Sequence, residues 1–250
     1  MSVVGGTPTN TKSAMQSFYD SVAEKYVIRD EGVRRYFHNG LELCWLSEST
    51  VQGKRFLDVG SGVGRMASFV GDQPSLFVGV DLSHQMLQIA KARCCTHSET
   101  AFLLQCDAEH LPFPVESFDI VTCLGLFEYV ADLEPFLREF LRVTTPQGRL
   151  LFTCHNLSAF RPLRNRSYHT VDYGVDAVRD AVQRTGYTVL RHETTYHLNG
   201  RWIWWLNRLL QPIKAGNIPV RWAVKFNRIL QKSKLFGYRG KVHLVLAERS

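Results

Sequence analysis

The sequence predicts an α/β fold: a doubly wound, mostly parallel sheet of seven strands with helices on both faces, an N-terminal helical cap and a helical insertion before the last strand. The main observation behind this prediction is that short apolar runs rich in β-branched residues alternate with segments of helical periodicity. Such alternation is typical of a parallel sheet covered by helices on both faces. The chain has 250 residues, 45% of them hydrophobic and 21% charged, as in ordinary globular proteins.

The individual elements follow from the apolar runs and from signals at helix ends. Strands are predicted at residues 55–59, 76–80, 101–106, 118–123, 149–154, 187–193 and 241–248. Helices are predicted at residues 13–26, 32–46, 65–71, 83–93, 132–143 and 172–185. Ser83 is expected to cap one helix and Gly186 to follow the end of another. Because such sheets bind ligands at the carboxyl ends of their strands, the residues after each strand are the candidate site residues.

Three regions are expected along the chain. Residues 1–46 form a polar lead and helical cap, residues 47–194 with 241–250 form the core, and residues 195–240 form the insertion. The first residues lack the basic and apolar parts of a signal peptide. No apolar run approaches the roughly 20 residues that a membrane-spanning helix needs. We therefore expect a cytoplasmic protein.

The cysteines do not indicate a metal site. The chain has six cysteines, and none of them forms a C-x-x-C pair. Reduced thiols are expected in the absence of a secretory signal. No metal is therefore expected.

A glycine-rich loop follows the first strand, where Asp58 opens the run D-V-G-S-G-V-G. Glycines at positions 60, 62 and 64 let the backbone turn tightly and approach a ligand. The following helix can offer free N–H groups to a carboxylate. A dinucleotide-binding loop reads G-x-G-x-x-G, but here the third glycine comes one position earlier and Arg65 follows it. This spacing disfavours NAD or FAD, and a G-x-x-x-x-G-K-[ST] phosphate loop is absent.

The loop resembles motif I of the Rossmann-like (class I) S-adenosylmethionine-dependent methyltransferases. The next two strands end in residues that this family uses, Asp81 and the pair Asp107-Ala108. A carboxylate at Asp81 has two acceptor oxygens and can take both ribose hydroxyls. The resemblance implies that Asp107 takes the adenine amino group and that the next backbone N–H meets a ring nitrogen. Taken alone, Asp81 could instead be a helix cap and Asp107 a turn residue.

The similarity extends over residues 55–153 and includes L-F-E-Y-V at 126–130. It resembles the subfamily that contains ubiquinone-biosynthesis and other small-molecule methyltransferases. Two positions depart from the pattern: Gln147 stands where a second glycine is usual, and Tyr129 stands where many relatives have histidine. The family role of that histidine is therefore not transferred to this chain.

The resemblance implies a site for S-adenosylmethionine, whose product is S-adenosylhomocysteine. The residues expected to bind it lie in the glycine loop, after the next three strands and on the N-terminal cap. They are Tyr26, Asp58, Gly60, Ser61, Gly62, Gly64, Asp81, Leu82, Met86, Asp107, Ala108, Glu109 and Leu124.

Methyl transfer depends mainly on in-line positioning and on charge stabilisation in a dry pocket. A general base is needed only if the acceptor must lose a proton. Four side chains near strand ends are candidates: His155, Glu128, Tyr129 and His169. His155 is the first choice because it directly follows the fifth strand, although a polar residue in a loop is an equally good interpretation.

The insertion concentrates the positive charge of the chain. The net charge is +7, yet residues 194–247 contain ten Lys and Arg and no Asp or Glu, together with four of the five tryptophans. Three interpretations stay open. The segment could be a lid over the acceptor, an interfacial helix pair on an anionic membrane, or an RNA-binding surface.

We therefore expect methyl transfer to a small, hydrophobic metabolite at an O, N or C atom. The expected partners are that acceptor and, through residues 195–240, an anionic membrane that the protein contacts peripherally; nucleic acid is less favoured. Motifs for amino groups of DNA bases, [DN]-P-P-[YFW], and for cytosine C5, Pro-Cys, are absent. The alternatives are an RNA or membrane-lipid methyltransferase and a non-catalytic regulatory subunit that binds the cofactor. The oligomeric state is left open.

Overall fold

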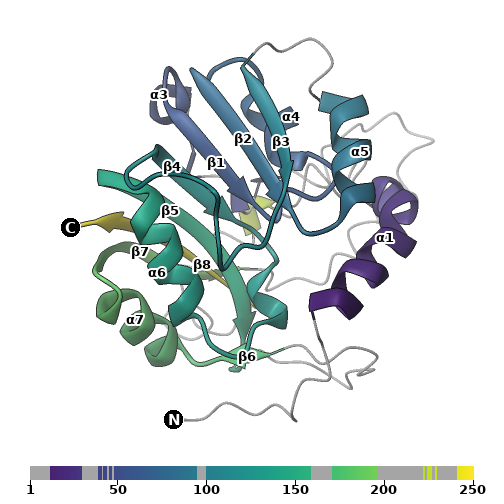
Figure 1. Ribbon diagram of the computed structural model, residues 1–250. Coiled ribbons are helices and arrows are strands. Elements are labelled where there is room, and N and C mark those ends of the chain that lie inside the picture. Colours follow the sequence, from purple (N-terminus) through teal and green to yellow (C-terminus); the bar gives the residue numbers. More distant parts are fainter. Residues whose placement is uncertain are drawn as a thin grey trace.

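The computed structural model shows an open sheet with helices on both faces (Figure 1). It describes residues 12–29, 39–40, 42–43, 45–46, 48–94, 100–158, 171–195, 222, 224–226, 229 and 241–250. The strands are β1 (Arg55–Val59), β2 (Leu76–Asp81), β3 (Ala101–Gln105), β4 (Phe118–Cys123), β5 (Thr144–Asn156), β6 (Asp172–Tyr173), β7 (Tyr187–Thr195) and β8 (Val242–Arg249). The helices are α1 (Lys12–Arg29), α3 (Glu48–Val51), α4 (Arg65–Val70), α5 (His84–Cys94), α6 (Glu134–Val143) and α7 (Val175–Arg184), with a 3-10 turn η1 (Phe127–Tyr129).

The strand order is β3-β2-β1-β4-β5-β8-β7, and the short β6 pairs with β5. Strands β1 to β5 pair in parallel, whereas β8 runs antiparallel between β5 and β7. The chain leaves β1 toward β3 on one side and returns to β4 on the other, so the order reverses between β1 and β4. Ligands bind at such a switch point, because the connections after the two strands diverge there. The predicted doubly wound, mostly parallel sheet is confirmed.

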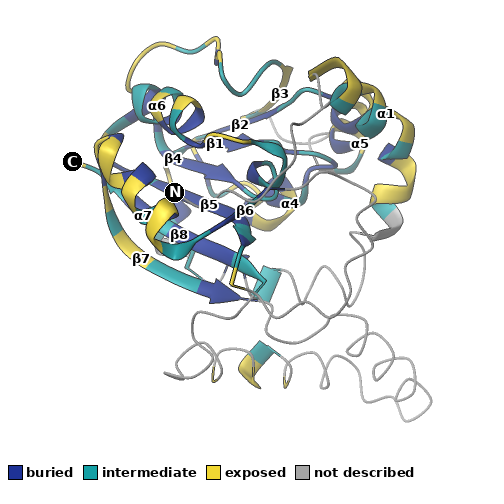
Figure 2. Ribbon diagram, turned by 90° about the horizontal axis from the view of Figure 1, so that it is seen from below, coloured by how far each residue is buried: buried dark blue, intermediate teal, exposed yellow. Residues whose placement is uncertain are grey.

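Two helical layers cover the sheet, and residues of β1 face them alternately, as the strand pleat requires. Leu57 and Val59 are buried in the cluster that contains α6 and α7. Phe56 is buried on the other face with Met66 of α4, and its ring stacks on Phe77 at 5.7 Å. Figures 1 and 2 show α6 and α7 on one side of the sheet and α4 on the other.

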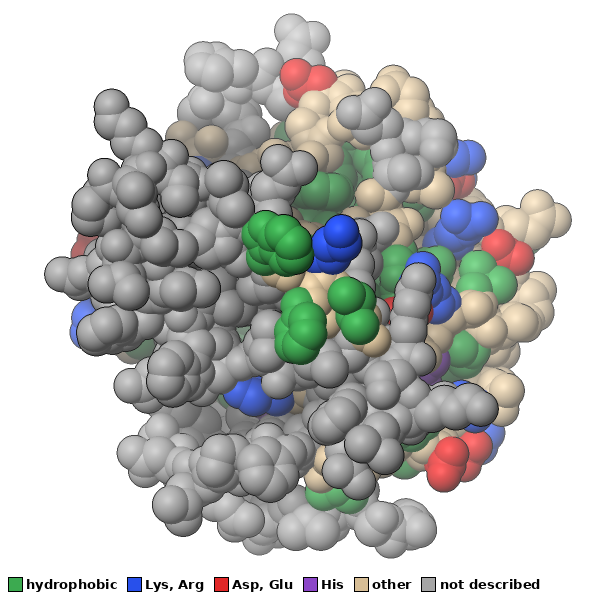
Figure 3. All heavy atoms as spheres, turned by 180° about the vertical axis from the view of Figure 1, so that it is seen from behind, with side chains coloured by type: hydrophobic (Ala, Val, Ile, Leu, Met, Phe, Trp, Pro, Cys, Tyr) green, Lys and Arg blue, Asp and Glu red, His purple; other side chains and the backbone are tan. Residues whose placement is uncertain are grey.

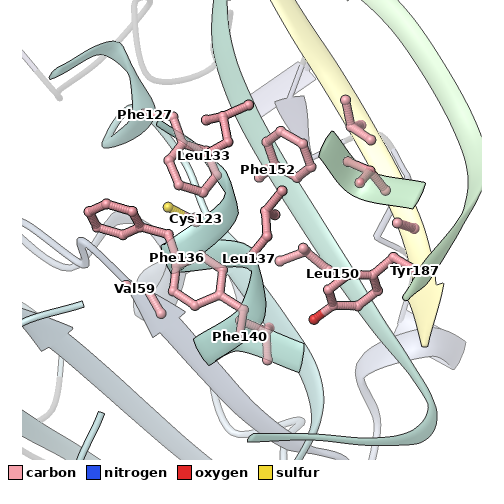
Figure 4. Close-up of a cluster of buried hydrophobic side chains, with 14 of the residues drawn as sticks. Val59, Cys123, Phe127, Leu133, Phe136, Leu137, Phe140, Leu150, Phe152 and Tyr187 are labelled. Atoms are coloured by element: carbon pink, nitrogen blue, oxygen red, sulfur yellow. The ribbon is translucent and has the colours of Figure 1, made fainter. Parts of the chain in front are cut away.

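The core under α6 is built from phenylalanines. The ring of Phe127 lies edge-on to Phe152 at 5.3 Å and to Phe136 at 5.8 Å, and Phe140 lies at 5.9 Å (Figure 4). Such contacts add about 0.5–1.5 kcal/mol each beyond burial. Because Phe127 opens η1, this packing fixes the turn that follows β4 and the residues next to it.

Two signals at helix ends are confirmed. The amide of Met86 donates to Ser83 Oγ at 3.2 Å, so Ser83 caps α5. Gly186 follows α7 with φ +94°, a conformation that glycine adopts without strain.

Two stretches differ from the prediction because tertiary pairing overrides the local pattern. Asp172 and Tyr173, predicted as helical, form β6 beside His155 and Asn156 of β5, so α7 begins only at Val175. β5 is longer than predicted, and the sheet has eight strands instead of seven.

The predicted helix at 32–46 ends early. Residues 39, 40 and 42 are helical, but Leu43, Trp45 and Leu46 are not. Leu43 is buried against Val51 and Phe56, and this burial turns the chain. The rest of that prediction lies outside the described residues.

Most of the predicted insertion also lies outside the described residues; residues 222, 224–226 and 229 are helical. In the part of the chain that the structure describes, no helix is both long enough and apolar enough to cross a membrane. The division of the chain into cap, core and insertion stays a prediction.

Candidate active site

A cavity of about 630 Å³ lies at the carboxyl ends of β1, β2, β3 and β4, beside the switch point. Helix α1 covers it with Lys12, Met15 and Tyr19. Its volume is in the range of small-molecule sites. Eleven of the residues expected to bind the cofactor line it: Tyr26, Gly60, Ser61, Gly62, Asp81, Leu82, Met86, Asp107, Ala108, Glu109 and Leu124.

The glycine loop is held against the end of β2. The amides of Gly60 and Ser61 both donate to the carbonyl of Val80, at 2.8 and 2.9 Å. Gly60 has φ +72° and Gly62 has φ +53°, so a side chain at either position would strain the backbone. Sequence reasoning missed Gly79: a Cβ there would lie 2.7 Å from Ser61 Oγ and 2.8 Å from Leu103 Cδ2. Because Gly79 has no side chain, the glycine loop can lie close to β2 at this position.

Asp81 joins the loop to α5. Its Oδ2 accepts from the amide of Gly62 at 2.8 Å, and its Oδ1 accepts from the amide of Ser83 at 2.9 Å. Burial raises the pKa of this carboxyl, although backbone hydrogen bonds from Ser83, Gly62 and Leu82 oppose the shift. Each oxygen keeps a lone pair beyond these bonds, and the residue lines the cavity. Asp81 therefore fits a ligand with two neighbouring hydroxyls, such as the ribose of S-adenosylmethionine.

Asp58 and Gly64 do not line the cavity but shape the loop from beneath. Asp58 is buried, and Thr122 Oγ1 donates to its Oδ1 at 2.7 Å. Burial raises the pKa of Asp58 to about 6. Gly64 precedes α4 with φ +82°, and its amide donates to the carbonyl of Ser61 at 3.1 Å. Both residues support the loop in this way, and their contact with the cofactor stays a prediction.

Lys12 bridges the two acidic side chains after β3. Its Nζ lies 2.6 Å from Asp107 Oδ2 and 2.8 Å from Glu109 Oε2. Burial acts to raise the pKa of Asp107, but the hydrogen bonds from Lys12 and the Glu109 amide, together with the charges of Lys12 and His110, outweigh it and the pKa is lowered. The side chain expected to meet adenine is thus paired with the N-terminal helix. A cluster of three potential metal ligands occurs here, Asp107 with Glu109 and His110, and Lys12 neutralises two of them.

Helix α1 is anchored by its own acidic residue. Asp20 Oδ1 accepts from Ser83 Oγ at 2.5 Å and from the amide of Gln85 at 3.2 Å. The Tyr19 ring lies edge-on to Tyr26 at 6.1 Å and to Tyr129 at 6.0 Å. Burial raises the pKa of the Tyr19 hydroxyl, so it is protonated at neutral pH. Aromatic side chains from α1 and η1 therefore form one wall of the cavity.

Arg65 and Glu42 also line the cavity, and neither was expected there. Arg65 Nη2 donates to Glu42 Oε2 at 2.6 Å, and both side chains are largely buried. Arg65 had been noted only as the residue that ends the glycine motif. A guanidinium at this point suits an anionic group of the ligand, such as the carboxylate of the methionine part of S-adenosylmethionine.

The four candidates for the general base have different positions. Glu128 and Tyr129 of η1 line the cavity, whereas His155 does not. His155 Nε2 lies 3.0 Å from Glu128 Oε1, and its Nδ1 lies 3.6 Å from Asp172 Oδ1. Glu128 thus stands between His155 and the cavity, because β5 is one strand further from the switch point than β4. His169 lies outside the described residues.

Asp172 is a residue that sequence reasoning missed. It reaches His155 only because β6 pairs with β5, where His155 and Asp172 are register partners. The amide of Val171 also donates to the carbonyl of Glu128 at 2.8 Å. No local pattern signals this pairing.

Comparison with known proteins connects this site to a family. Residues 57–152 match the family of methyltransferase domains. A ubiquinone biosynthesis O-methyltransferase of Coxiella burnetii is 33% identical over 123 residues, 47% of this chain and 51% of that protein. A ubiquinone/menaquinone biosynthesis C-methyltransferase of Hahella chejuensis is 31% identical over 150 residues, 57% of this chain and 60% of that protein.

The chain carries a class I methyltransferase domain. Over this domain the chain is similar to ubiquinone-biosynthesis methyltransferases. The chain spans only about half to three fifths of the length of these relatives. A methyltransferase of Thermotoga maritima, a possible histamine N-methyltransferase, has the same fold with a TM-score of 0.62 and 18% identity, over 94% of this chain and 100% of that one.

The matched part of the methyltransferase domain contains the cavity residues at the ends of β1, β2 and β3, including Asp81 and Asp107. It also contains Glu128. Lys12, His155 and Asp172 lie outside the match. These three proteins are named for methyl transfer to oxygen, to carbon and to nitrogen.

Proposed function

We propose that this chain transfers the methyl group of S-adenosylmethionine to a small, hydrophobic metabolite. The observation that carries the proposal is the cavity at the switch point, where Asp81 presents two carboxylate oxygens beside the glycine loop. When bound, the cofactor supplies an activated methyl group. Asp81 would hold its ribose, Asp107 its adenine amino group and Arg65 its carboxylate.

A hydrophobic acceptor is supported by the apolar part of the cavity lining. Apolar and aromatic side chains line the cavity there, contributed by α1, η1 and the start of α6: Met15, Tyr19, Leu126, Tyr129, Val130, Pro135 and Phe136. Such a wall excludes water, which strengthens the electrostatic interactions inside.

Glu128 is the group that we propose to accept a proton from the acceptor. If the acceptor is a hydroxyl, its oxygen would bond to the methyl carbon as the bond from that carbon to the cofactor sulfur breaks and S-adenosylhomocysteine leaves. The O–H bond would break as well, and its proton would pass to the Glu128 carboxylate. The distance of 3.0 Å between Glu128 Oε1 and His155 Nε2 suits a hydrogen bond that holds this carboxylate in place. His155 is then a positioning residue with Asp172 behind it.

The cofactor part of the proposal is tested by calorimetry with S-adenosylhomocysteine. Binding in the micromolar range is expected, and no binding at millimolar concentration would overturn it. The acceptor part is tested by transfer of a tritiated methyl group from S-adenosylmethionine to small molecules that partition into an organic solvent.

Three outcomes contradict the acceptor part. Label recovered in RNA or in membrane phospholipid would replace the small metabolite by that acceptor. Tight cofactor binding with no labelled product would favour a regulatory subunit.

A further inference from the structure

We propose that an exposed apolar face on the helical residues 222, 226 and 229 docks this chain onto an anionic membrane surface. The face consists of Trp222, Phe226 and Ile229, which are 66%, 49% and 56% exposed. We call it the Trp222 face. Figure 3 shows hydrophobic side chains gathered beside a basic one on this side of the molecule.

Helical spacing puts these three side chains on one side. At about 100° per residue, positions 222, 226 and 229 fall within a sector of about 60°. Val224 points the opposite way and is half-buried. A Cβ built on Gly40 would lie 3.0 Å from Val224 Cγ2, so the Val224 side packs against residue 40. The inner side of this helical turn is therefore occupied, and the Trp222 face is left to solvent.

The charge beside this face is positive. Lys225 Nζ lies 5.8 Å from the centre of the Trp222 ring, next to the apolar sector. Residues 194–247 contain ten Lys and Arg and no Asp or Glu, while the rest of the chain has more acidic than basic residues. Tryptophan and aliphatic side chains beside lysine are the composition that binds the interface of an anionic bilayer. The charge is thus complementary to lipid phosphate.

An RNA partner is less well supported by the same residues. Bases stack on aromatic rings, and phosphate contacts need several cations on one face. Ile229 has no ring, and the described residues of this turn supply one lysine. Among the other large exposed hydrophobic side chains of the described residues, none repeats this combination. Tyr26, Phe69, Phe102, Leu104 and Leu190 lie on other elements, and Val115 lies in the turn before β4.

The segment that packs under the Trp222 face leads directly to the cavity. Residue 40, which Val224 contacts, is two residues before Glu42, and Glu42 lines the cavity beside Arg65. Docking through the Trp222 face would therefore bring a wall of the cavity close to the lipid interface, where a hydrophobic acceptor is concentrated. Docking itself does not require the proposed methyl transfer.

Flotation of the full chain with vesicles tests the proposal. The wild-type chain is expected to float with phosphatidylglycerol-rich vesicles at low salt and much less with pure phosphatidylcholine vesicles. Phe226→Ser and Lys225→Glu should each lower the partition coefficient about tenfold, because binding scales with buried apolar area and with charge. The matched controls are Phe102→Ser, whose ring is 55% exposed on β3, and Lys91→Glu on the surface of α5.

The controls should bind as the wild type does, and thermal unfolding of all four variants verifies that each is folded. Wild-type protein that stays unbound at low salt would overturn the proposal, as would equal losses for Phe226→Ser and Phe102→Ser. The partner would be RNA and not a membrane if the wild-type chain does not float but shifts the electrophoretic mobility of total tRNA, and if Lys225→Glu abolishes that shift. The partner would be a second copy of the chain if the wild type does not float but forms a dimer, and if Phe226→Ser dissociates that dimer. Calorimetry with S-adenosylhomocysteine on the same samples shows separately whether the proposed function holds.

Discussion

His155 stands behind Glu128, with its Nε2 3.0 Å from Glu128 Oε1, and only Glu128 reaches the cavity. A histidine at the end of a strand would ordinarily be the first candidate for a general base. Here the turn η1 inserts a carboxylate between that histidine and the space for the acceptor. The arrangement separates the group that can meet the acceptor from the group that orients it.

Glu128→Gln should lower kcat by about 10²–10³-fold, because an amide cannot accept the proton. KM and the affinity for S-adenosylhomocysteine should change little. The measurement is steady-state methyl transfer to the acceptor found by the labelling experiment. Glu116→Gln, on the surface near Arg249, is the control and should leave kcat unchanged.

His155→Ala should lower kcat about tenfold with little effect on KM, and His155→Gln, which keeps a donor, should restore part of the loss. Asp172→Asn should have a smaller effect in the same direction. If His155→Ala costs more than Glu128→Gln, the order of the two residues is reversed and His155 is the base.

Asp81→Ala should weaken S-adenosylhomocysteine binding by about 10–100-fold. Hydrogen bonds to a charged group contribute roughly 1.5–3 kcal/mol, and this carboxylate also holds Gly62 and Ser83. Calorimetry measures the change, and Asp72→Ala in the exposed turn after α4 is the control. Unchanged affinity in Asp81→Ala would show that the ribose binds elsewhere.

Lys12→Ala should tighten S-adenosylhomocysteine binding about two- to fivefold. Partly exposed ion pairs contribute roughly 0.2–1 kcal/mol, and the cofactor must replace Lys12 at Asp107 if adenine binds there. Lys25→Ala, on the exposed side of α1, tests whether loss of any lysine on this helix has the same effect. Weaker binding in Lys12→Ala would mean that Lys12 closes over the cofactor.

Asp58 should make the protein less stable as the pH rises from about 4 to 6. Burial raises its pKa to about 6 in the folded state from the usual 3.8 of an aspartate. In this window the folded state holds a proton that the unfolded state has lost, so stability falls by up to about 3 kcal/mol. Thermal unfolding at pH 4.5 and pH 7 should show a smaller difference for Asp58→Asn than for the wild type. An equal difference would exclude Asp58 as the cause.

The strands and the glycine loop were predictable because their signals are local. β1 and β4 match their predicted residues, since each is a short apolar run with polar residues at its ends. Ser83 and Gly186 were placed correctly because capping depends on a few neighbouring residues. The segment at 172–173 was misassigned because its strand exists only through pairing with β5.

The sequence by itself determined the cofactor side of the site: the loop after β1, Asp81 and Asp107 each follow a strand, and parallel strands bring their ends together at one edge. Only the tertiary structure decided the residues around them. Three contacts join segments that are far apart in the chain, so no periodicity of the sequence indicates them: Lys12–Asp107, Arg65–Glu42 and Glu128–His155. Glu128 follows β4, which lies at the switch point, and therefore reaches the cavity. His155 is on β5, one strand further away, and therefore lies behind Glu128. The order of the strands arises only when the sheet forms.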